Sequence, residues 1–251
     1  MLLSLVIPAH NEVANVGATV ERMHEALAAA DVPHEIVVVD DASVDGTGEL
    51  LEGLAARLPA VRVVHRRPPP GVGRAVRAGL AAMQGDAAVI VMADGSDRPE
   101  DVAAYYGQLS EGNDAVFGTR FAPGGRVQGY PPLKLLVNRI GNHALRLLFG
   151  RSENDLSNAF KAYRREVLRR IEAAGPLEAE QFEVFVELPL KALATGARVV
   201  TVPVEWRGRR AGASKLKLVR QLPRYAATIL RLWLSRAALA RRPRPPTATS
   251  R

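Results

Sequence analysis

The chain contains no cysteine, and this absence removes several classes of protein at once. Disulfide frameworks, zinc sites built on cysteine and catalysis by a cysteine nucleophile are all excluded. Aromatic residues are scarce too, at 5% of 251 residues, so the stacking platforms of single-strand nucleic-acid binders are missing. Global disorder is excluded because 47% hydrophobic residues suffice to bury the core of an α/β domain of ordinary size.

Long apolar runs are also absent. No stretch approaches the roughly 18–20 apolar residues of a membrane-spanning helix, and the least charged window near the carboxyl end runs only from Tyr225 to Leu230. Residues 1–4 lack the basic residues of a secretory leader, and the first apolar run stops at Pro8. We therefore expect a cytoplasmic protein, with peripheral attachment to the cytoplasmic face of a membrane left open.

Acidic residues are missing from the last part of the chain. Residues 206–251 hold 13 Lys and Arg and no Asp or Glu, whereas residues 1–205 hold 21 basic and 26 acidic residues. This asymmetry indicates an anionic partner for the basic segment: membrane phospholipid, nucleic acid or a phosphorylated substrate. We expect a catalytic domain over residues 1–215, a basic amphipathic segment over 216–240 and a disordered tail over 241–251.

The basic segment has two faces on a helical wheel. One face carries Lys217, Arg220, Arg224, Arg231 and Arg242, and the other carries Leu218, Leu222, Tyr225, Ile229 and Trp233. Such a pattern is typical of a helix at a membrane surface and of a helix packed on the core with a solvated basic face, and the sequence leaves both open. Pro223 predicts a division into two amphipathic helices.

Strand and helix signals alternate through the first half of the chain. Apolar runs predict strands at 2–7, 35–39, 61–65, 87–92, 114–118 and 199–204. Helical spacing predicts helices at 13–30, 46–58, 74–83, from 99 onward, at 133–149 and at 155–165. This order indicates an α/β fold with a mostly parallel sheet, whose ligands bind at the carboxyl ends of the strands.

Acidic residues follow three of these strands. Glu12, the pair Asp40 and Asp41, and Asp94 with Asp97 all stand at predicted strand ends. A single Asp there often only caps the next helix. Three clusters on one edge repel one another unless a cation or a ligand rich in hydrogen-bond donors lies between them, and carboxylates suit Mg²⁺ or Mn²⁺.

Basic residues gather after the fifth strand and again near residue 210. The first group holds Arg120, Arg126 and Arg139, and the second holds Arg207, Arg209, Arg210 and Lys215. Small residues at 212–214 before Lys215 suit a phosphate cradle, although a solvated loop has the same composition.

Seven motifs then occur in a characteristic order. They are VIPAHNE (6–12), VVVDDASVDGT (37–47), GVGRAVRAG (71–79), MADGSDRPED (92–101), GTRFAPGG (118–125), SNAFKAYRREVL (157–168) and WRGRRAGASK (206–215). Together they resemble glycosyltransferase family 2, in the branch of dolichyl- and polyprenyl-phosphate sugar synthases such as the dolichyl-phosphate mannose synthases. The resemblance covers roughly residues 2–220.

The resemblance implies a GT-A fold that binds a GDP- or UDP-linked sugar and inverts the sugar on transfer, with the sequence leaving the base open. It assigns the nucleotide site to Pro8, Ala9, Asn11, Glu12, Asp40 and Asp41. It assigns Mg²⁺ or Mn²⁺ to Asp94, which matches the last Asp of the Asp-x-Asp motif, with Ser96 and Asp97 nearby. It assigns the donor and acceptor phosphates to Arg120, Arg139, Arg209 and Lys215.

Two departures bear on function. Met92 replaces the first Asp of the usual metal motif, and we hypothesise that Asp97 compensates. The related enzymes with membrane anchors carry spanning helices after the basic loop, whereas this chain has the amphipathic segment instead.

Three functions compete at this point. The first is transfer of a sugar such as mannose to a polyprenyl phosphate, which is largely a dianion at pH 7 and needs no general base. The second is the same class of enzyme with a soluble or carrier-tethered acceptor, which needs a base. Glu178, Glu180, Glu183 and Glu187 are the candidates for that base, although a solvated or loop role is favoured for them. The third, a nucleic-acid-binding module, is disfavoured by the acidic body and the few aromatics.

Overall fold

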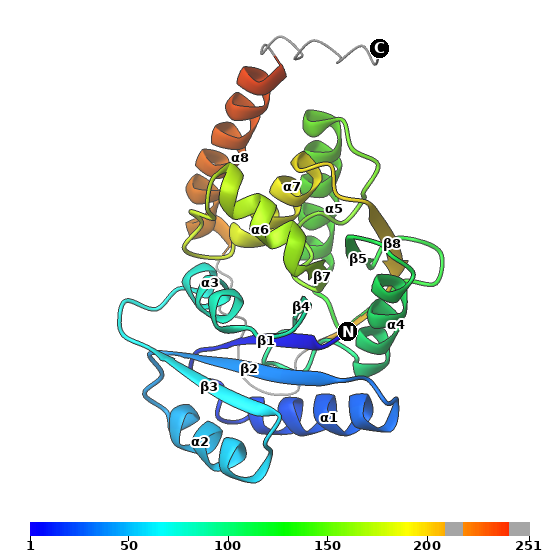
Figure 1. Ribbon diagram of the computed structural model, residues 1–251. Coiled ribbons are helices and arrows are strands. Elements are labelled where there is room, and N and C mark those ends of the chain that lie inside the picture. Colours follow the sequence, from blue (N-terminus) through cyan, green and yellow to red (C-terminus); the bar gives the residue numbers. More distant parts are fainter. Residues whose placement is uncertain (209–217, 241–251) are drawn as a thin grey trace.

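The computed structural model describes residues 1–208 and 218–240, with side chains described for 1–208 and 221–235. A seven-stranded sheet in the order β3-β2-β1-β4-β7-β5-β8 forms its centre, beside a two-stranded sheet of β6 and β9 (Figure 1). The strands are β1 (Leu3–Ala9), β2 (His34–Asp41), β3 (Val61–Arg66), β4 (Ala87–Ile90), β5 (Ala115–Thr119), β6 (Arg126–Gln128), β7 (Lys161–Arg164), β8 (Val199–Pro203) and β9 (Glu205–Arg207). The helices are α1 (Val16–Ala29), α2 (Thr47–Arg57), α3 (Val72–Ala82), α4 (Pro99–Ser110), α5 (Pro132–Phe149), α6 (Arg165–Ala174), α7 (Val184–Ala194) and α8 (Leu218–Ala240).

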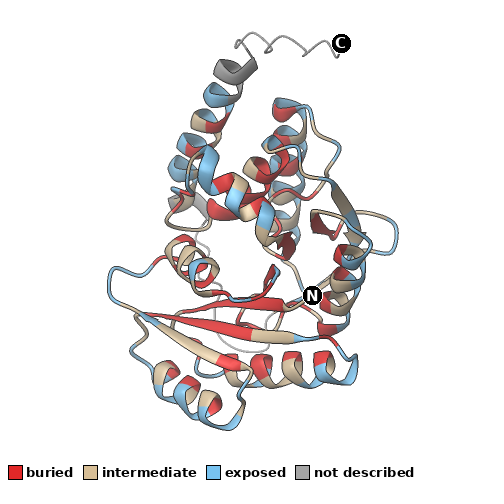
Figure 2. Ribbon diagram, viewed as in Figure 1, coloured by how far each residue is buried: buried red, intermediate tan, exposed pale blue. Residues whose placement is uncertain are grey.

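The predicted α/β fold with a mostly parallel sheet is confirmed. All seven residues of β1 are buried, because helices cover both faces of the sheet and leave no solvent side. One layer of the core joins the sheet to α1, α2 and α4, and the other joins it to α3, α6 and α7 (Figure 2). Strand β1 pairs in parallel with β2 on one side and with β4 on the other. The chain therefore reverses its direction of travel across the sheet at β1, where open α/β sheets bind ligands.

The prediction of a helix over residues 155–165 is wrong. Residues 161–164 form β7, which lies antiparallel between β4 and β5, and helix α6 begins only at Arg165. Pairing with a strand on each side outweighs the local helical spacing of this short segment. The same antiparallel insertion separates the first four strands of the sheet from β5 and β8.

The expected division at Pro223 is also wrong, because α8 is one helix from Leu218 to Ala240 with Pro223 inside it. One backbone hydrogen bond is lost at the proline. Packing of Tyr225, Ile229 and Leu232 against the α6–α7 layer of the core offsets that loss. Within the part of the chain that the structure describes, no helix is both long enough and apolar enough to cross a membrane. The predicted tail at 241–251 lies outside the described residues.

Candidate active site

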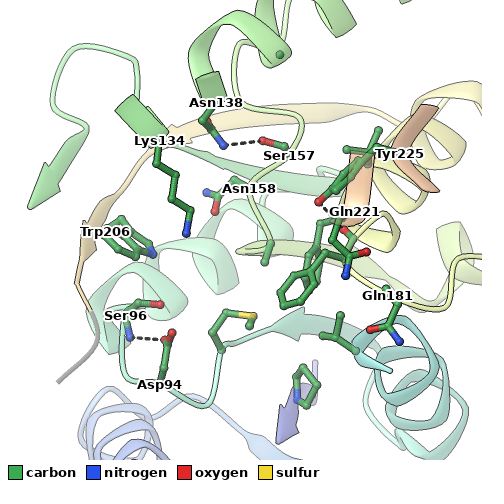
Figure 3. Close-up of a pocket in the computed structure, with 18 of the residues that line it drawn as sticks. Asp94, Ser96, Lys134, Asn138, Ser157, Asn158, Gln181, Trp206, Gln221 and Tyr225 are labelled. Atoms are coloured by element: carbon green, nitrogen blue, oxygen red, sulfur yellow. Dashed lines mark hydrogen bonds between the residues drawn. The ribbon is translucent and has the colours of Figure 1, made fainter. Parts of the chain in front are cut away.

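A cavity of about 560 Å³ opens at the carboxyl ends of β1, β2 and β4 and continues between α5, α7 and α8. Figure 3 shows polar side chains from several of these elements turned toward it. At the sheet end its walls carry the acidic residues Glu12, Asp41, Asp94 and Asp97. At the helix end the walls are mostly apolar and include Val137, Leu145, Phe182, Phe185, Leu222 and Ile229. One cavity thus joins a carboxylate-rich end to a hydrophobic groove.

The loop after β1 is held to the loop after β2 by direct hydrogen bonds. Asn11 adopts a positive φ of 49°, which Asn tolerates, and its backbone N–H donates to Ser43 Oγ at 2.9 Å. The backbone N–H of Glu12 donates to Thr47 Oγ1 at 2.9 Å. Pro8, Ala9 and Glu12 line the cavity, whereas Asn11 is outside its lining and joins the two loops, since its Oδ1 also accepts from the backbone N–H of Val44 at 2.8 Å.

The two aspartates at the end of β2 have different surroundings. Asp41 lines the cavity and accepts a hydrogen bond from the backbone N–H of Gly71 at 2.5 Å, while also pairing with Arg66. Asp40 is outside the cavity lining and accepts from the backbone N–H of Ser43 at 3.2 Å and from His65 Nδ1 at 3.1 Å. Asp41, of the two, is therefore the one that faces the cavity.

The three residues predicted to hold a metal, Asp94, Ser96 and Asp97, all line the cavity. Asp94 Oδ1 accepts from the backbone N–H of Ser96 at 3.1 Å, and Asp97 Oδ2 accepts from the backbone N–H of Met92 at 2.8 Å. Burial raises the pKa of Asp97 to about 7, and the neighbouring negative charge of Asp94 adds to this rise against the Met92 hydrogen bond.

This donor set fits a divalent cation. Two nearly buried carboxylates, with the charge of Asp94 disfavouring the ionised form of Asp97 and a hydroxyl beside them, are an arrangement that a cation relieves. Within the described residues there is no group of three or more His, Cys, Asp or Glu placed to hold a metal. Mg²⁺ is commonly held by one or two carboxylates together with substrate phosphates, so this smaller set suffices when a diphosphate is bound.

Arg120 lies at the centre of a buried network beside the cavity. Its Nε and Nη2 atoms donate to the two carboxylate oxygens of Asp155 at 2.8 and 2.7 Å, and Nη2 also reaches Asn138 Oδ1 at 3.3 Å. Most of its donors are thereby committed to the protein. Arg120 lines the cavity, but the geometry makes it chiefly the residue that orients Asp155 and Asn138.

Lys161 backs the same network from β7. Its Nζ donates to the backbone carbonyls of Asp155 at 3.2 Å, Leu156 at 3.1 Å and Asn158. Burial lowers its pKa to about 7, with the Asp155 carboxylate opposing and Arg120 reinforcing that shift. These contacts fix the 155–158 loop, whose Ser157 and Asn158 side chains line the cavity.

Sequence reasoning missed several lining residues, above all Lys134 and Asn138 of α5. Asn138 Nδ2 donates to Ser157 Oγ at 3.3 Å (Figure 3). Asn142 Nδ2 donates to the same atom at 2.8 Å. A signal was available: Lys134, Asn138 and Asn142 recur every four residues, which places three polar side chains on one face of a helix.

The other residues predicted to bind phosphate are Arg139, Arg209 and Lys215. Arg139 is exposed on α5 and is outside the cavity lining, with its guanidinium carbon 5.2 Å from the centroid of the Phe121 ring. Arg209 and Lys215 lie outside the described residues.

The glutamates considered as general bases are absent from the cavity lining. Of the solvated or loop role favoured for them, solvation does not hold for Glu183 and Glu187, which are 4% and 0% exposed. Glu183 does precede α7 and accepts from the backbone N–H groups of Glu180 and Gln181 at 3.1 Å each. Glu187 accepts the backbone N–H groups of Glu178 and Ala179 at 3.0 and 2.7 Å and pairs with Lys191 at 3.2 Å. Satisfied and buried in this way, Glu187 is a structural anion.

The glycines of GVGRAVRAG serve close packing. A Cβ atom at Gly71 would lie 2.5 Å from the carbonyl oxygen of Glu180, and one at Gly73 would lie 2.4 Å from that of Ala179. The start of α3 therefore presses directly on segment 179–181, which contributes Gln181 to the cavity wall.

The sequence profile described as Glycosyl transferase family 2 matches residues 4–172, about two thirds of the chain. This chain belongs to glycosyltransferase family 2. The polyprenol monophosphomannose synthase of Mycolicibacterium smegmatis is 34% identical to it over 84% of this chain and 80% of that protein. The undecaprenyl-phosphate mannosyltransferase of Micrococcus luteus is 32% identical over 86% of this chain and 88% of that protein.

Solved structures agree with this family 2 assignment at the level of the fold. The glucosyl-3-phosphoglycerate synthase of Mycobacterium tuberculosis, in complex with Mn²⁺, UDP and glucosyl-3-phosphoglycerate, is 23% identical with a TM-score of 0.68. The likeness covers 94% of this chain and 80% of that one. The predicted GT-A-like fold is confirmed. The family 2 profile spans β1 to α6 and so includes the acidic cavity end, whereas α7 and α8 follow it.

Proposed function

We propose that this family 2 glycosyltransferase uses Mg²⁺ or Mn²⁺ and transfers a sugar such as mannose from a GDP- or UDP-linked donor to a polyprenyl phosphate. The observation that carries the proposal is the form of the cavity. Its acidic end suits a cation and a diphosphate, its middle carries amide, hydroxyl and lysine side chains, and its far end is an apolar groove.

The donor belongs at the acidic end. Glu12 and Asp41 provide carboxylate hydrogen-bond acceptors for the nucleoside. The backbone N–H of Glu12 donates to Thr47 Oγ1, and the Asp41 carboxylate accepts from the backbone N–H of Gly71, so both positions are fixed. Asp94, Ser96 and Asp97 would hold the cation, which supplies positive charge to the departing diphosphate. The names of the two mannosyltransferase relatives support mannose as the sugar.

The acceptor phosphate belongs in the middle of the cavity. Lys134 supplies a positive charge, and Asn138, Ser157 and Asn158 supply polar groups on a frame fixed by Arg120 and Lys161. A phosphate dianion is already a nucleophile, so the protein needs only to orient it and to exclude water.

The glutamates argue against an acceptor that needs a base. Since Glu178, Glu180, Glu183 and Glu187 are all outside the cavity lining, they are not placed to deprotonate a hydroxyl there. The soluble-acceptor alternative therefore has less support than the lipid phosphate.

The apolar groove suits a prenyl chain, and the outer surfaces of its walls suit a lipid surface. Helix α5 exposes a continuous apolar stripe made of Leu133, Leu136, Val137, Ile140, Leu147 and Leu148. Helix α8 exposes Leu222, Leu230, Trp233 and Leu234, and the two helices extend on the same side of the sheet (Figures 1 and 2). Exposed stripes of this size mark interaction sites, so we propose peripheral contact with a membrane through α5 and α8.

The test is a comparison of Michaelis constants. Initial rates are measured with varied GDP-mannose and varied short-chain polyprenyl phosphate in detergent, for the wild type and Lys134→Met. Loss of one charged phosphate contact should raise the KM for the lipid phosphate about tenfold and leave the donor KM within twofold. An equal rise in both constants, or turnover with a hydroxyl acceptor only, would contradict the proposal.

A further inference from the structure

Helix α8 forms a wall of the active-site cavity, although it lies beyond the segment that the family profile matches. Gln221, Leu222, Tyr225 and Ile229 line the cavity from this helix. Three of these four side chains are apolar or aromatic. Gln221 is therefore the polar member of the described α8 wall, and it stands nearest to the start of the helix.

The carboxamide of Gln221 has an unmet hydrogen-bonding group. Its Oε1 atom is buried and has no hydrogen-bond partner among the described residues. Buried polar atoms in folded proteins nearly always have a partner, so an orphan in the wall of a cavity is an atom that a bound ligand is positioned to satisfy.

Neighbouring polar groups are satisfied within the protein. Gln181 Nε2 donates to the carbonyl of Pro70 at 3.1 Å, and Tyr225 Oη donates to the carbonyl of Phe182 at 3.1 Å. Figure 3 shows the Gln221 side chain beside Tyr225 and Gln181, with its amide turned toward the cavity. Gln221 Oε1 thus differs from these neighbouring groups, whose hydrogen bonds connect parts of the protein to one another.

The position of Gln221 is fixed because helix α8 is held in place by ion pairs. Arg231 Nη2 donates to Glu187 Oε1 at 2.9 Å, and Arg224 Nη1 lies 3.8 Å from Glu180 Oε2. These contacts tie α8 to α7 and to the segment that precedes α7. Helix α8 runs away from the sheet toward its carboxyl end (Figure 1). Its first turns, which carry Gln221 and Leu222, are therefore the part of the helix that lies nearest the sheet.

We propose that Gln221 hydrogen-bonds a hydroxyl group of the transferred sugar and so helps to select the donor. The inference rests on the proposed function, in which the sugar lies between the diphosphate at the acidic end and the acceptor in the groove. A hydroxyl both donates and accepts, so it satisfies either face of the carboxamide, whereas an ionised phosphate only accepts.

The experiment distinguishes a contact with the sugar from a contact with the nucleotide by comparing affinities for a nucleotide sugar and for the matching nucleoside diphosphate. Calorimetry measures binding of GDP-mannose and GDP, and of UDP-glucose and UDP, to the wild type and to Gln221→Met in the presence of Mn²⁺. Loss of one hydrogen bond to the sugar should weaken binding of the preferred nucleotide sugar about tenfold. Affinity for the matching nucleoside diphosphate should stay within twofold, because it lacks the sugar. Gln84→Met, at an exposed glutamine outside the cavity, is the matched control and should change neither affinity.

A second readout distinguishes a ligand contact from a structural role. Replacing an unsatisfied buried amide by an apolar side chain of similar length should leave the melting temperature unchanged or higher. A melting temperature that falls together with both affinities would overturn the proposal. Equal losses for the nucleotide sugar and the diphosphate, a change confined to the acceptor KM, or no change at all would also overturn it. A wild type that binds none of the nucleotide sugars contradicts the proposed function itself, and the role of Gln221 fails with it.

Discussion

Arg231 Nη2 donates to Glu187 Oε1 at 2.9 Å and thereby ties helix α8 to helix α7. Glu187 is fully buried, and Arg231 also pairs with Glu178. A basic residue of the amphipathic segment therefore neutralises a buried glutamate. This pairing answers part of the question that the helical wheel left open, since Arg231 faces acidic protein and Tyr225, Ile229 and Leu232 pack on the core.

Substitution of Arg231 by Met should destabilise the protein by about 1–3 kcal/mol. The loss is smaller than for a fully buried pair, because the Arg231 side chain is 35% exposed and Lys191 remains beside Glu187. Thermal or urea unfolding measures it. Arg57→Met, which breaks the exposed pair with Glu21, is the control and should cost less than about 1 kcal/mol. Equal losses in the two variants would show that Arg231 is not a structural counter-ion.

A methyl group at Gly73 should be poorly tolerated, because its Cβ would lie 2.4 Å from the carbonyl oxygen of Ala179. We expect Gly73→Ala to lower stability by about 1–3 kcal/mol and to lower activity through movement of the 179–181 segment. Gly53→Ala on α2 is the matched control, since nothing lies within 4 Å of its Cβ. That helix substitution should stabilise the protein by about 0.5–1 kcal/mol. Urea unfolding measures the stability of both variants, and initial rates measure their activity. A Gly73→Ala variant more stable than the wild type would contradict the close contact between Gly73 and Ala179.

Lys161 should make stability rise with pH above neutrality. Burial lowers its pKa to about 7 from its ordinary value of 10.5. Between these values the unfolded chain holds a proton that the folded protein has released, so the free energy of unfolding increases as pH rises. Urea unfolding from pH 7 to 9 should show this increase in the wild type, and Lys161→Met should show a flatter profile. Identical slopes would mean that the lysine keeps an ordinary pKa in the folded protein.

Asp97 should make cation binding depend on pH. Burial raises its pKa to about 7, so the carboxylate is mostly protonated at pH 6 and mostly ionised at pH 8. If Asp97 helps to hold the cation, the affinity for Mn²⁺ in the presence of nucleoside diphosphate should rise up to about tenfold over this range. Calorimetric titrations of Asp97→Asn should give a weaker and nearly constant affinity. A variant that follows the wild-type pH profile would remove Asp97 from the cation site.

Much of the fold could be predicted, because the parallel strands are short apolar runs and the helices between them carry apolar residues at helical spacing. The acidic strand ends followed from the same reasoning, since the carboxyl ends of parallel strands meet at one edge. Strand β7 could not be found in this way, because its place in the sheet depends on pairing with β4 and β5 from distant parts of the chain. Local periodicity carries no information about such pairing.

The helix end of the cavity was harder to predict than its acidic end. Lys134, Asn138 and Gln221 lie on helices whose facing partners the sequence does not reveal. The basic segment predicted an anionic partner, and the structure shows that two of its residues, Arg224 and Arg231, lie against glutamates of segment 178–187. A helical wheel shows which residues share a face and cannot show what that face meets.

The central claim is that sugar passes from a nucleotide at the acidic end of the cavity to a lipid phosphate in the groove. The most direct test supplies purified protein and Mn²⁺ with GDP-mannose or UDP-glucose labelled in the sugar, with and without a short polyprenyl phosphate, and measures label extracted into organic solvent. We predict label in the organic phase only when the lipid phosphate is present, and none with Asp94→Ala. Donor hydrolysis that is indifferent to the lipid phosphate, with no label in the organic phase, would contradict the account.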